Sequence, residues 1–123
     1  MYKRQSYVFP YRLTLSTNFE NRSGSIFART ALFTSSGSPI PSITLNVEPL
    51  GAERNPSTNL LDFRLSKAFA LRGDHELSLR MNTYNTLNIN TVLSANASSG
   101  STYLRPLTIV PPRIFEFGTS FKF

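Results

Sequence analysis

The chain has 123 residues, no cysteine, one histidine, seven carboxylate side chains and a formal net charge of +6. It therefore has no disulfide framework and no Cys-ligated metal site, and its apolar runs fall far short of the roughly 18 residues of a membrane-spanning helix. The charge does not favour nucleic acid as a partner, because Lys and Arg stand singly, except at Lys3-Arg4, and mostly alternate with apolar residues.

The N-terminal part predicts two strands. An incomplete strand covers about residues 2–9 and is followed by Pro10. Strict alternation over residues 11–20 then predicts a full strand. Its apolar face is Tyr11, Leu13, Leu15, Thr17 and Phe19, and its polar face is Arg12, Thr14, Ser16, Asn18 and Glu20. No segment typical of a signal peptide follows Met1, so we expect Met1 to lie inside a longer protein, or the gene to be a fragment.

A long connection, about residues 21–59, is rich in Ser, Asn, Thr, Gly and Pro. It contains two strand-like pieces, 26–33 and 43–47. These pieces form either a hairpin raised above the main sheet or two further strands within it. The raised hairpin is favoured, because the second piece is short and Pro39 and Pro41 lie at the joint.

Two more alternating strands, about 60–71 and 75–86, are joined by the tight turn Arg72-Gly73-Asp74-His75. Lys67 is the one charge on an apolar face, so we expect it near a strand end or with its amine reaching the interface. A second long connection covers about residues 86–112. Within it, residues 87–93 form either a short helix or a continuation of the preceding strand, and the sequence fits both. The last strand covers about 113–123.

Together these features predict an all-β, antiparallel transmembrane β-barrel segment of about four to six strands. The strands run about 9–11 residues, aromatic residues gather at their ends, and short turns alternate with long loops, as in outer-membrane barrels. The apolar face would then contact lipid and the polar face would line the lumen. Alternation alone also fits a soluble two-layer protein, in which the apolar face covers a core.

The chain stops at Glu116-Phe-Gly-Thr-Ser-Phe-Lys-Phe123. This segment resembles the C-terminal assembly signal of outer-membrane proteins, with Glu116, Gly118, Phe121 and Phe123 at its defining positions. A terminal strand of this kind is recognised by backbone pairing and by side-chain pockets at alternate positions. The resemblance implies the barrel-assembly machinery as a partner.

Four further segments carry a narrower resemblance: residues 46–51 (NVEPLG), 59–67 (NLLDFRLSK), 84–90 (YNTLNIN) and 110–115 (VPPRIF). In order and spacing they resemble the C-terminal part of TonB-dependent outer-membrane receptors, of the type that carries a carboxypeptidase-regulatory-like domain. The resemblance spans most of residues 7–123 and implies the end of a 22-stranded barrel in the bacterial outer membrane. The remaining wall, the plug domain and, through the upstream region, TonB would be its partners.

Chemistry-bearing motifs are few. No nucleophile elbow, phosphate loop or metal-ligand spacing occurs, so neither an enzyme nor a cofactor is expected. Charges of both signs fall on the predicted polar faces. Arg64 opposite Glu76, or Arg80 beside Asp62, would brace the wall or contact the plug, and neutralising Arg64 should then lower stability. These lumen-facing charges are Glu20, Asp62, Arg64, Glu76 and Arg80.

The leading prediction is the C-terminal barrel segment of a receptor that imports a scarce nutrient or binds an extracellular ligand. Two other readings stay open: a soluble β-sandwich that binds carbohydrate or acts in adhesion, and a small complete barrel or oligomeric wall piece of the adhesin-anchor kind. The substrate is not predicted.

Overall fold

The computed structural model describes residues 1–35, 37, 39 and 42–123. They divide into two compact units. Unit 1 comprises Met1–Arg22, Asn59–Ile89 and Pro111–Phe123, and unit 2 comprises Ser23–Thr58 and Asn90–Val110. The described residues are all-β and their sheets are antiparallel, which confirms the predicted fold class at that level. No helix among them has the length and apolarity needed to span a membrane.

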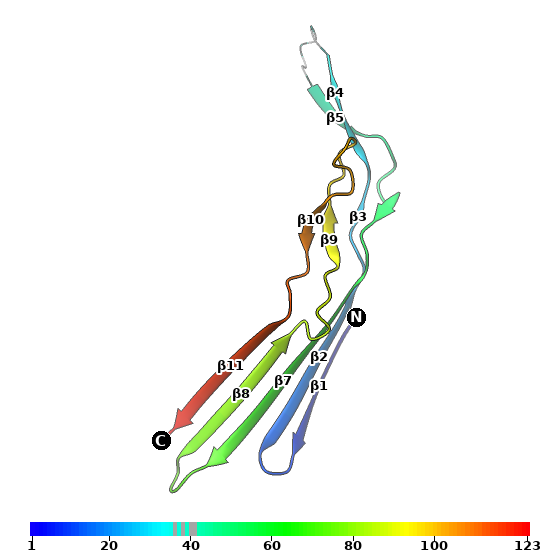
Figure 1. Cartoon of the computed structure of the whole chain (residues 1–123). Coiled ribbons are helices and arrows are strands. Elements are labelled where there is room, and N and C mark those ends of the chain that lie inside the picture. Colours follow the sequence, from blue (N-terminus) through cyan, green and yellow to red (C-terminus); the bar gives the residue numbers. More distant parts are fainter. Residues whose placement is uncertain (36, 38, 40–41) are drawn as a thin grey trace. The chain divides into compact units, whose positions relative to one another are not determined.

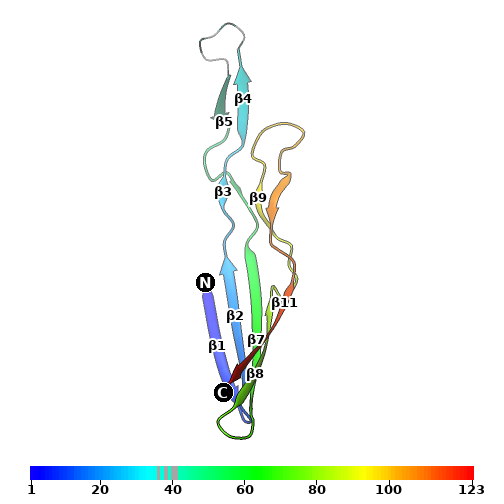
Figure 2. The same cartoon turned by 90° about the vertical axis from the view of Figure 1, so that its left-hand side faces the viewer.

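Unit 1 is built on one sheet of five strands in the order β1-β2-β7-β8-β11. Each strand lies beside the one that precedes it among these five, so the sheet is a meander (Figures 1 and 2). All five strands were predicted, the first as an incomplete strand and the other four from the alternation, and their bounds agree within about two residues. They are β1 (Tyr2–Phe9), β2 (Leu13–Arg22), β7 (Thr58–Ala70), β8 (Glu76–Tyr84) and β11 (Ile114–Lys122).

Short turns join β1 to β2 and β7 to β8 at one end of this sheet. The first was predicted wrongly as the start of a strand, because Tyr11 and Arg12 both adopt positive φ (65° and 57°) and Tyr11 is 88% exposed. A left-handed pair reverses the chain and cannot continue a strand. The second turn agrees with the prediction, with Gly73 at φ 77° and the Leu71 amide donating to the His75 carbonyl at 2.9 Å.

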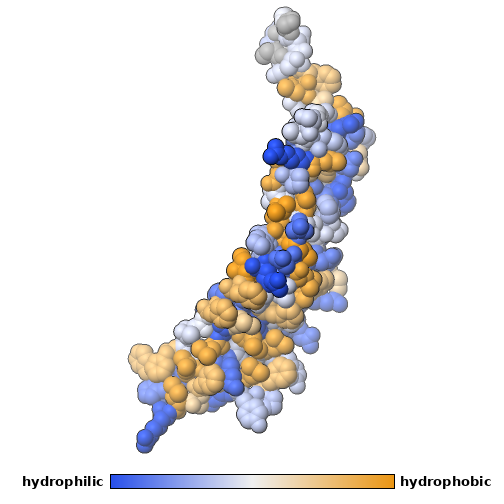
Figure 3. Space-filling model, viewed as in Figure 1, coloured by the Kyte–Doolittle hydropathy of each residue, from blue (hydrophilic) through white to orange (hydrophobic). Residues whose placement is uncertain are grey.

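The strand register gives the sheet one apolar and one polar face. Leu65 lies opposite Met81, which lies opposite Phe117, whereas Arg64, Asn82 and Glu116 form the equivalent polar row. Apolar side chains gather over the sheet in Figure 3 and remain open, as in Phe117, which is 75% exposed. Ala28 and Val110 are the buried apolar residues of the described chain, and both belong to unit 2. Unit 1 is therefore a single layer without a core of its own.

Unit 2 consists of three two-stranded sheets. One of them, β4 with β5, forms a hairpin separate from the five-stranded sheet, which is the favoured of the two predicted arrangements. Of the two prolines expected at its joint, Pro41 lies outside the described residues. The pairs are β3 (Ile26–Phe27) with β6 (Glu53–Arg54), β4 (Thr30–Thr34) with β5 (Ser42–Asn46), and β9 (Val92–Ala95) with β10 (Pro106–Ile109).

Residues 87–93, which the sequence left open, form neither a helix nor a continued strand. A turn at residues 85–87 follows β8, and β9 begins at Val92. The pairing of β9 with β10 was not predicted, because strands of four residues with register shifts show no usable alternation.

Candidate functional site

The five predicted charges lie on one face of the unit 1 sheet. Asn18 and Glu20 share a face of β2, and the Asn18 amide donates to Asp62 on β7 at 3.2 Å. Arg64 shares that face of β7 and lies opposite Asn82 of β8. Because side chains alternate along a strand, Arg80 and Glu76 lie on the same face as Asn82. The alternation therefore predicted which residues share the polar face.

The predicted partners of these charges are wrong. The register places Glu76 opposite Ala70, while Arg64 lies opposite Asn82. Asp62 accepts hydrogen bonds from the Asn18 side chain and from the Asn85 amide (3.0 Å), not from Arg80. Alternation fixes the face of a residue but leaves its cross-strand neighbour undetermined.

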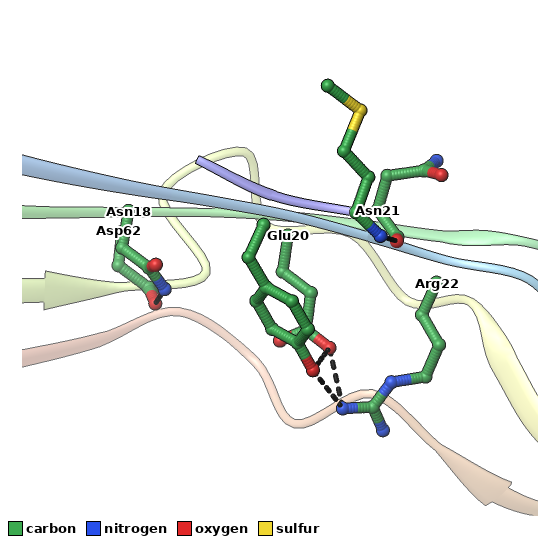
Figure 4. Close-up of polar contacts among 7 residues, drawn as sticks. Asn18, Glu20, Asn21, Arg22 and Asp62 are labelled. Atoms are coloured by element: carbon green, nitrogen blue, oxygen red, sulfur yellow. Dashed lines mark hydrogen bonds and ion pairs between the residues drawn. The ribbon is translucent and has the colours of Figure 1, made fainter. Parts of the chain in front are cut away.

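Other arginines neutralise two of the carboxylates. Arg12, in the β1–β2 turn, pairs with Glu76 at 2.9 Å, and Arg22 pairs with Glu20 at 2.5 Å. The Tyr2 hydroxyl also donates to Glu20 at 3.0 Å; the Glu20–Arg22 and Asn18–Asp62 contacts are drawn in Figure 4. The Arg12 and Glu76 side chains are 60% and 39% exposed, so their pair adds only about 0–1 kcal/mol. Within the described chain, Arg64 and Arg80 form no ion pair.

Gly118 provides the space that the Arg80 side chain occupies. The two residues lie opposite each other on β11 and β8. A Cβ atom at position 118 would stand 2.5 Å from Arg80 Nε and 3.0 Å from its Cγ. Gly118 does not have positive φ, so sterics alone and not backbone strain call for glycine here. The glycine of the predicted assembly signal thus lets a guanidinium lie across the terminal strand.

Two grooves lie side by side on the polar face and share Ser16 and Arg64. The first, of about 360 Å³, is lined by Arg4, Asn18, Asp62 and Tyr84, among others. The second, of about 310 Å³, contains Arg64, Arg80 and hydroxyl side chains, and no carboxylate lines it. The polar face is therefore hollowed beside Arg64 and Arg80.

A turn at Asn85 ties the end of β8 to the start of β11. Asn85 is buried with φ 49°, and its side-chain amide donates to the carbonyls of Ile89 (2.9 Å) and Pro111 (2.8 Å). Its side-chain oxygen accepts from the Ile89 amide at 3.0 Å. Nearby, Asn88 accepts from the Arg113 amide at 3.0 Å. These contacts join residues from the segments 59–67, 84–90 and 110–115 that carry the family resemblance.

The terminal strand pairs with β8 on one side only. Glu116 accepts hydrogen bonds from Asn82 at 3.2 Å and from the Tyr84 hydroxyl at 3.0 Å. Phe121 stacks between His75 and Phe123, with ring centroids 5.8 and 6.3 Å apart. Phe123 itself is 90% exposed. His75 is an exposed turn residue, as predicted, and its ring contacts the proposed signal.

Lys67 lies three residues before the end of β7, towards the end that carries the short turns. Its amine lies 5.2 Å from the centre of the Phe69 ring, within cation–π range. The structure thus agrees with the expected position near a strand end.

Unit 2 contains a polar cluster of its own. Arg29 pairs with Glu48 at 3.0 Å, and its guanidinium lies 5.6 Å from the centre of the Tyr103 ring. Desolvation, with the nearby carboxylates of Glu53 and Glu48, raises the pKa of Tyr103, so its phenol stays neutral at pH 7. This arrangement braces the unit and presents no nucleophile.

No protein-family model, curated protein or solved structure matches the sequence.

Sequence reasoning missed the residues that hold the charges in place. Asn18, Asn82 and Asn85 were taken as polar-face or loop residues without a role, although all three donate hydrogen bonds to a carboxylate or to a backbone carbonyl. The one available signal was the asparagine-rich segment 84–90, which was quoted for its family resemblance alone.

Proposed function

We propose that the chain forms part of the wall of an outer-membrane β-barrel, as the C-terminal barrel segment of a TonB-dependent receptor. In that role it contributes strands that contact lipid on one face and line the lumen on the other. It contains no feature that performs transport by itself. The whole receptor would import a nutrient or bind an extracellular ligand.

One observation carries this proposal: the apolar face of a single-layer sheet is uncovered. Five strands present Leu65, Met81, Phe117 and further apolar side chains to one side, and unit 1 has no second layer to cover them. A contiguous apolar face of this kind is unfavourable in water and needs a partner surface. The opposite face of the same sheet carries the polar residues of the alternating pattern. A single layer between lipid and a polar lumen therefore explains the pattern without a second protein layer. Lipid is the partner that fits a face so rich in phenylalanine.

Strand dimensions support the same proposal. The nine-residue strand β8 is roughly 30 Å long, and at a tilt of about 40° it crosses roughly 23 Å, close to the apolar band of about 25 Å. All short turns lie at one end of the meander and both long connections lie at the other, the asymmetry of outer-membrane barrels.

The free outer edges of β1 and β11 also agree with a segment of a larger wall. Each edge presents unpaired backbone groups, which in a soluble protein invite aggregation. In a barrel both edges pair with further strands, and no edge remains. The assignment to the TonB-dependent class rests on the four sequence segments, three of which meet around Asn85. The partners that follow are the rest of the barrel, the plug, TonB and the barrel-assembly machinery.

A tryptophan pair tests the proposal, because the chain has no native tryptophan. Phe117→Trp places the probe on the apolar face of β11, and Ser120→Trp places it on the polar face of the same strand. The full chain is folded into vesicles that contain brominated acyl chains, and far-UV circular dichroism verifies strand formation. We expect strong quenching of the probe at 117 and little quenching at 120.

The rival functions give different results. A chain that stays monomeric and folded in plain buffer, with the probe at 117 shielded from iodide, would be a soluble β-sandwich. A discrete small oligomer in detergent, with the probe at 117 quenched by lipid, would indicate an adhesin-type anchor built from several copies. Equal quenching at positions 117 and 120 would contradict the assignment of the two faces.

A further inference from the structure

The second groove of the polar face joins two guanidinium groups to a row of hydroxyls. Ser16, Ser66, Ser78 and Ser120 come from four adjacent strands, β2, β7, β8 and β11, and all line it together with Arg64 and Arg80. Ser78 lies opposite Ser120, and Ser66 lies opposite Arg80. The groove is thus a continuous polar strip across most of the sheet.

The two arginines stand close to each other, and neither forms an ion pair among the described residues. Arg64 lies opposite Asn82, and Arg80 lies opposite Ser66, so they occupy diagonal positions on neighbouring strands. Diagonal neighbours are about 7–8 Å apart, within reach of long side chains, and two like charges there repel each other. Asp62 accepts hydrogen bonds from Asn18 and Asn85, and Glu116 accepts them from Asn82 and Tyr84. These donors are neutral, and Glu116 attracts both arginines from beyond ion-pair distance.

Gly118 leaves the room that the Arg80 side chain occupies. Gly118 removes the Cβ atom that would collide with the Arg80 side chain, although glycine weakens the interior of a strand. A salt bridge does not explain this arrangement, because Arg80 has no ion-pair partner among the described residues. An external anion between Arg64 and Arg80 does explain it, because it would offset the repulsion and accept hydrogen bonds from both guanidinium groups.

We propose that Arg64, Arg80 and the flanking serines form a binding site for an oxyanion, the phosphate or carboxylate group of a small polar solute. The guanidinium groups bind the charged oxygens, and the hydroxyls of Ser66 and Ser120, which line the same groove, bind further oxygens of the same ligand. The inference rests on the polar face alone and holds whether or not the opposite face contacts lipid.

Titration of the full chain, folded in detergent micelles, with inorganic phosphate and with citrate tests the site. Isothermal calorimetry at constant ionic strength measures the dissociation constants. We expect at least one of these anions to bind with one site per chain. Arg64→Gln/Arg80→Gln should weaken binding at least about tenfold, since charge-assisted contacts of this kind are the strong ones. Arg64→Lys should retain part of the affinity, because lysine keeps the positive charge but lacks the planar guanidinium that donates two parallel hydrogen bonds.

The matched control is Arg72→Gln/Arg105→Gln, which removes the same two charges from exposed positions outside the groove. It should bind as the unchanged chain does. Equal weakening in both double variants would mean attraction by net charge only and would overturn the site. Failure of phosphate and citrate to bind, or binding only of a glutamate-rich peptide, would overturn it as well.

Two measurements keep the outcome clear. If the double variant does not fold, the anion affinity of the single variant Arg64→Gln tests the site instead. This variant should fold, because Arg64 makes no ion pair whose loss would disturb the sheet. Quenching at Trp-substituted Phe117 reports on the lipid-facing side independently. Loss of anion binding with lipid quenching intact, or the reverse, therefore separates failure of this site from failure of the barrel proposal.

Discussion

Asn85 carries more of the local structure than any other single side chain of unit 1. It is 5% exposed, it adopts a left-handed backbone conformation, and its side chain forms three hydrogen bonds. Asparagine tolerates positive φ better than most residues, and its amide both donates and accepts. Position 85 therefore needs asparagine for two independent reasons.

Replacing Asn85 separates those two reasons. Asn85→Ala should lower the free energy of unfolding by about 2–4 kcal/mol, because it leaves buried backbone groups unpaired and adds left-handed strain. Asn85→Gly should cost about 1 kcal/mol less than the alanine variant, since glycine relieves the strain but not the lost hydrogen bonds. Urea titration in micelles, followed by circular dichroism, measures both. Equal stability of the alanine variant and the unchanged chain would contradict this role.

At the scale of elements, β8 and β11 depend on each other through Arg80 and Gly118. Glycine in a strand interior is normally a weakness, but here its missing Cβ accommodates a neighbouring side chain. The two positions should therefore be energetically coupled.

A double-mutant cycle measures that coupling. Gly118→Ala should destabilise the chain by about 1 kcal/mol or more, because the Arg80 side chain must move. In an Arg80→Ala background the same substitution should be neutral or stabilising, since the space is then empty and alanine suits a strand better than glycine does. Unfolding midpoints of the four proteins give the interaction energy. An interaction energy near zero would show that Gly118 serves another purpose.

The elements also show how far the sequence could be interpreted. Four of the five long strands were predictable because their residues alternate between apolar and polar over most of their length. The first, β1, does not alternate regularly and was predicted only as an incomplete strand. The short strands β6, β9 and β10 were not predictable, since two to four residues form no pattern. The predicted piece 26–33 contains two strands, β3 and the larger part of β4. The start of β2 was misplaced because neither Tyr11 nor Arg12 signals a left-handed turn.

The candidate site was predictable in composition but not in contacts. Glu20, Asp62, Arg64, Glu76 and Arg80 were placed on one face, but their partners depend on register, which turn geometry sets. Glu76 pairs with Arg12 because the β1–β2 turn brings Arg12 across β7 to β8. No local pattern in the sequence indicates that Arg12 lies near Glu76. Likewise, no local pattern indicates that Arg80 lies opposite Gly118.

At the scale of the whole molecule, the hairpin β4–β5 is an appendage that can be shortened. Its two strands pair with each other in register, from Thr30 opposite Asn46 to Thr34 opposite Ser42, and Thr30 also forms a bridge with Ser98. Thr30 and Asn46 already face each other, so a two-residue turn can join them.

Replacement of residues 31–45 by Asn-Gly should leave the five-stranded sheet intact. The free energy of unfolding should change by no more than about 1 kcal/mol, because loop length contributes weakly. Circular dichroism and urea titration in micelles provide the measurement. A loss of strand signal larger than the eight removed strand residues, 31–34 and 42–45, account for would show that unit 1 depends on this hairpin.

The meander order of unit 1 has a consequence for how the sheet is assembled. Every strand joins the outer side of its predecessor, so no later strand must be inserted between two that are already hydrogen-bonded. The sheet can therefore grow one hairpin at a time as the polypeptide is delivered, and each addition leaves a single fresh edge. In the proposed barrel, closure would then need one final pairing event and no rearrangement of the strands already in place.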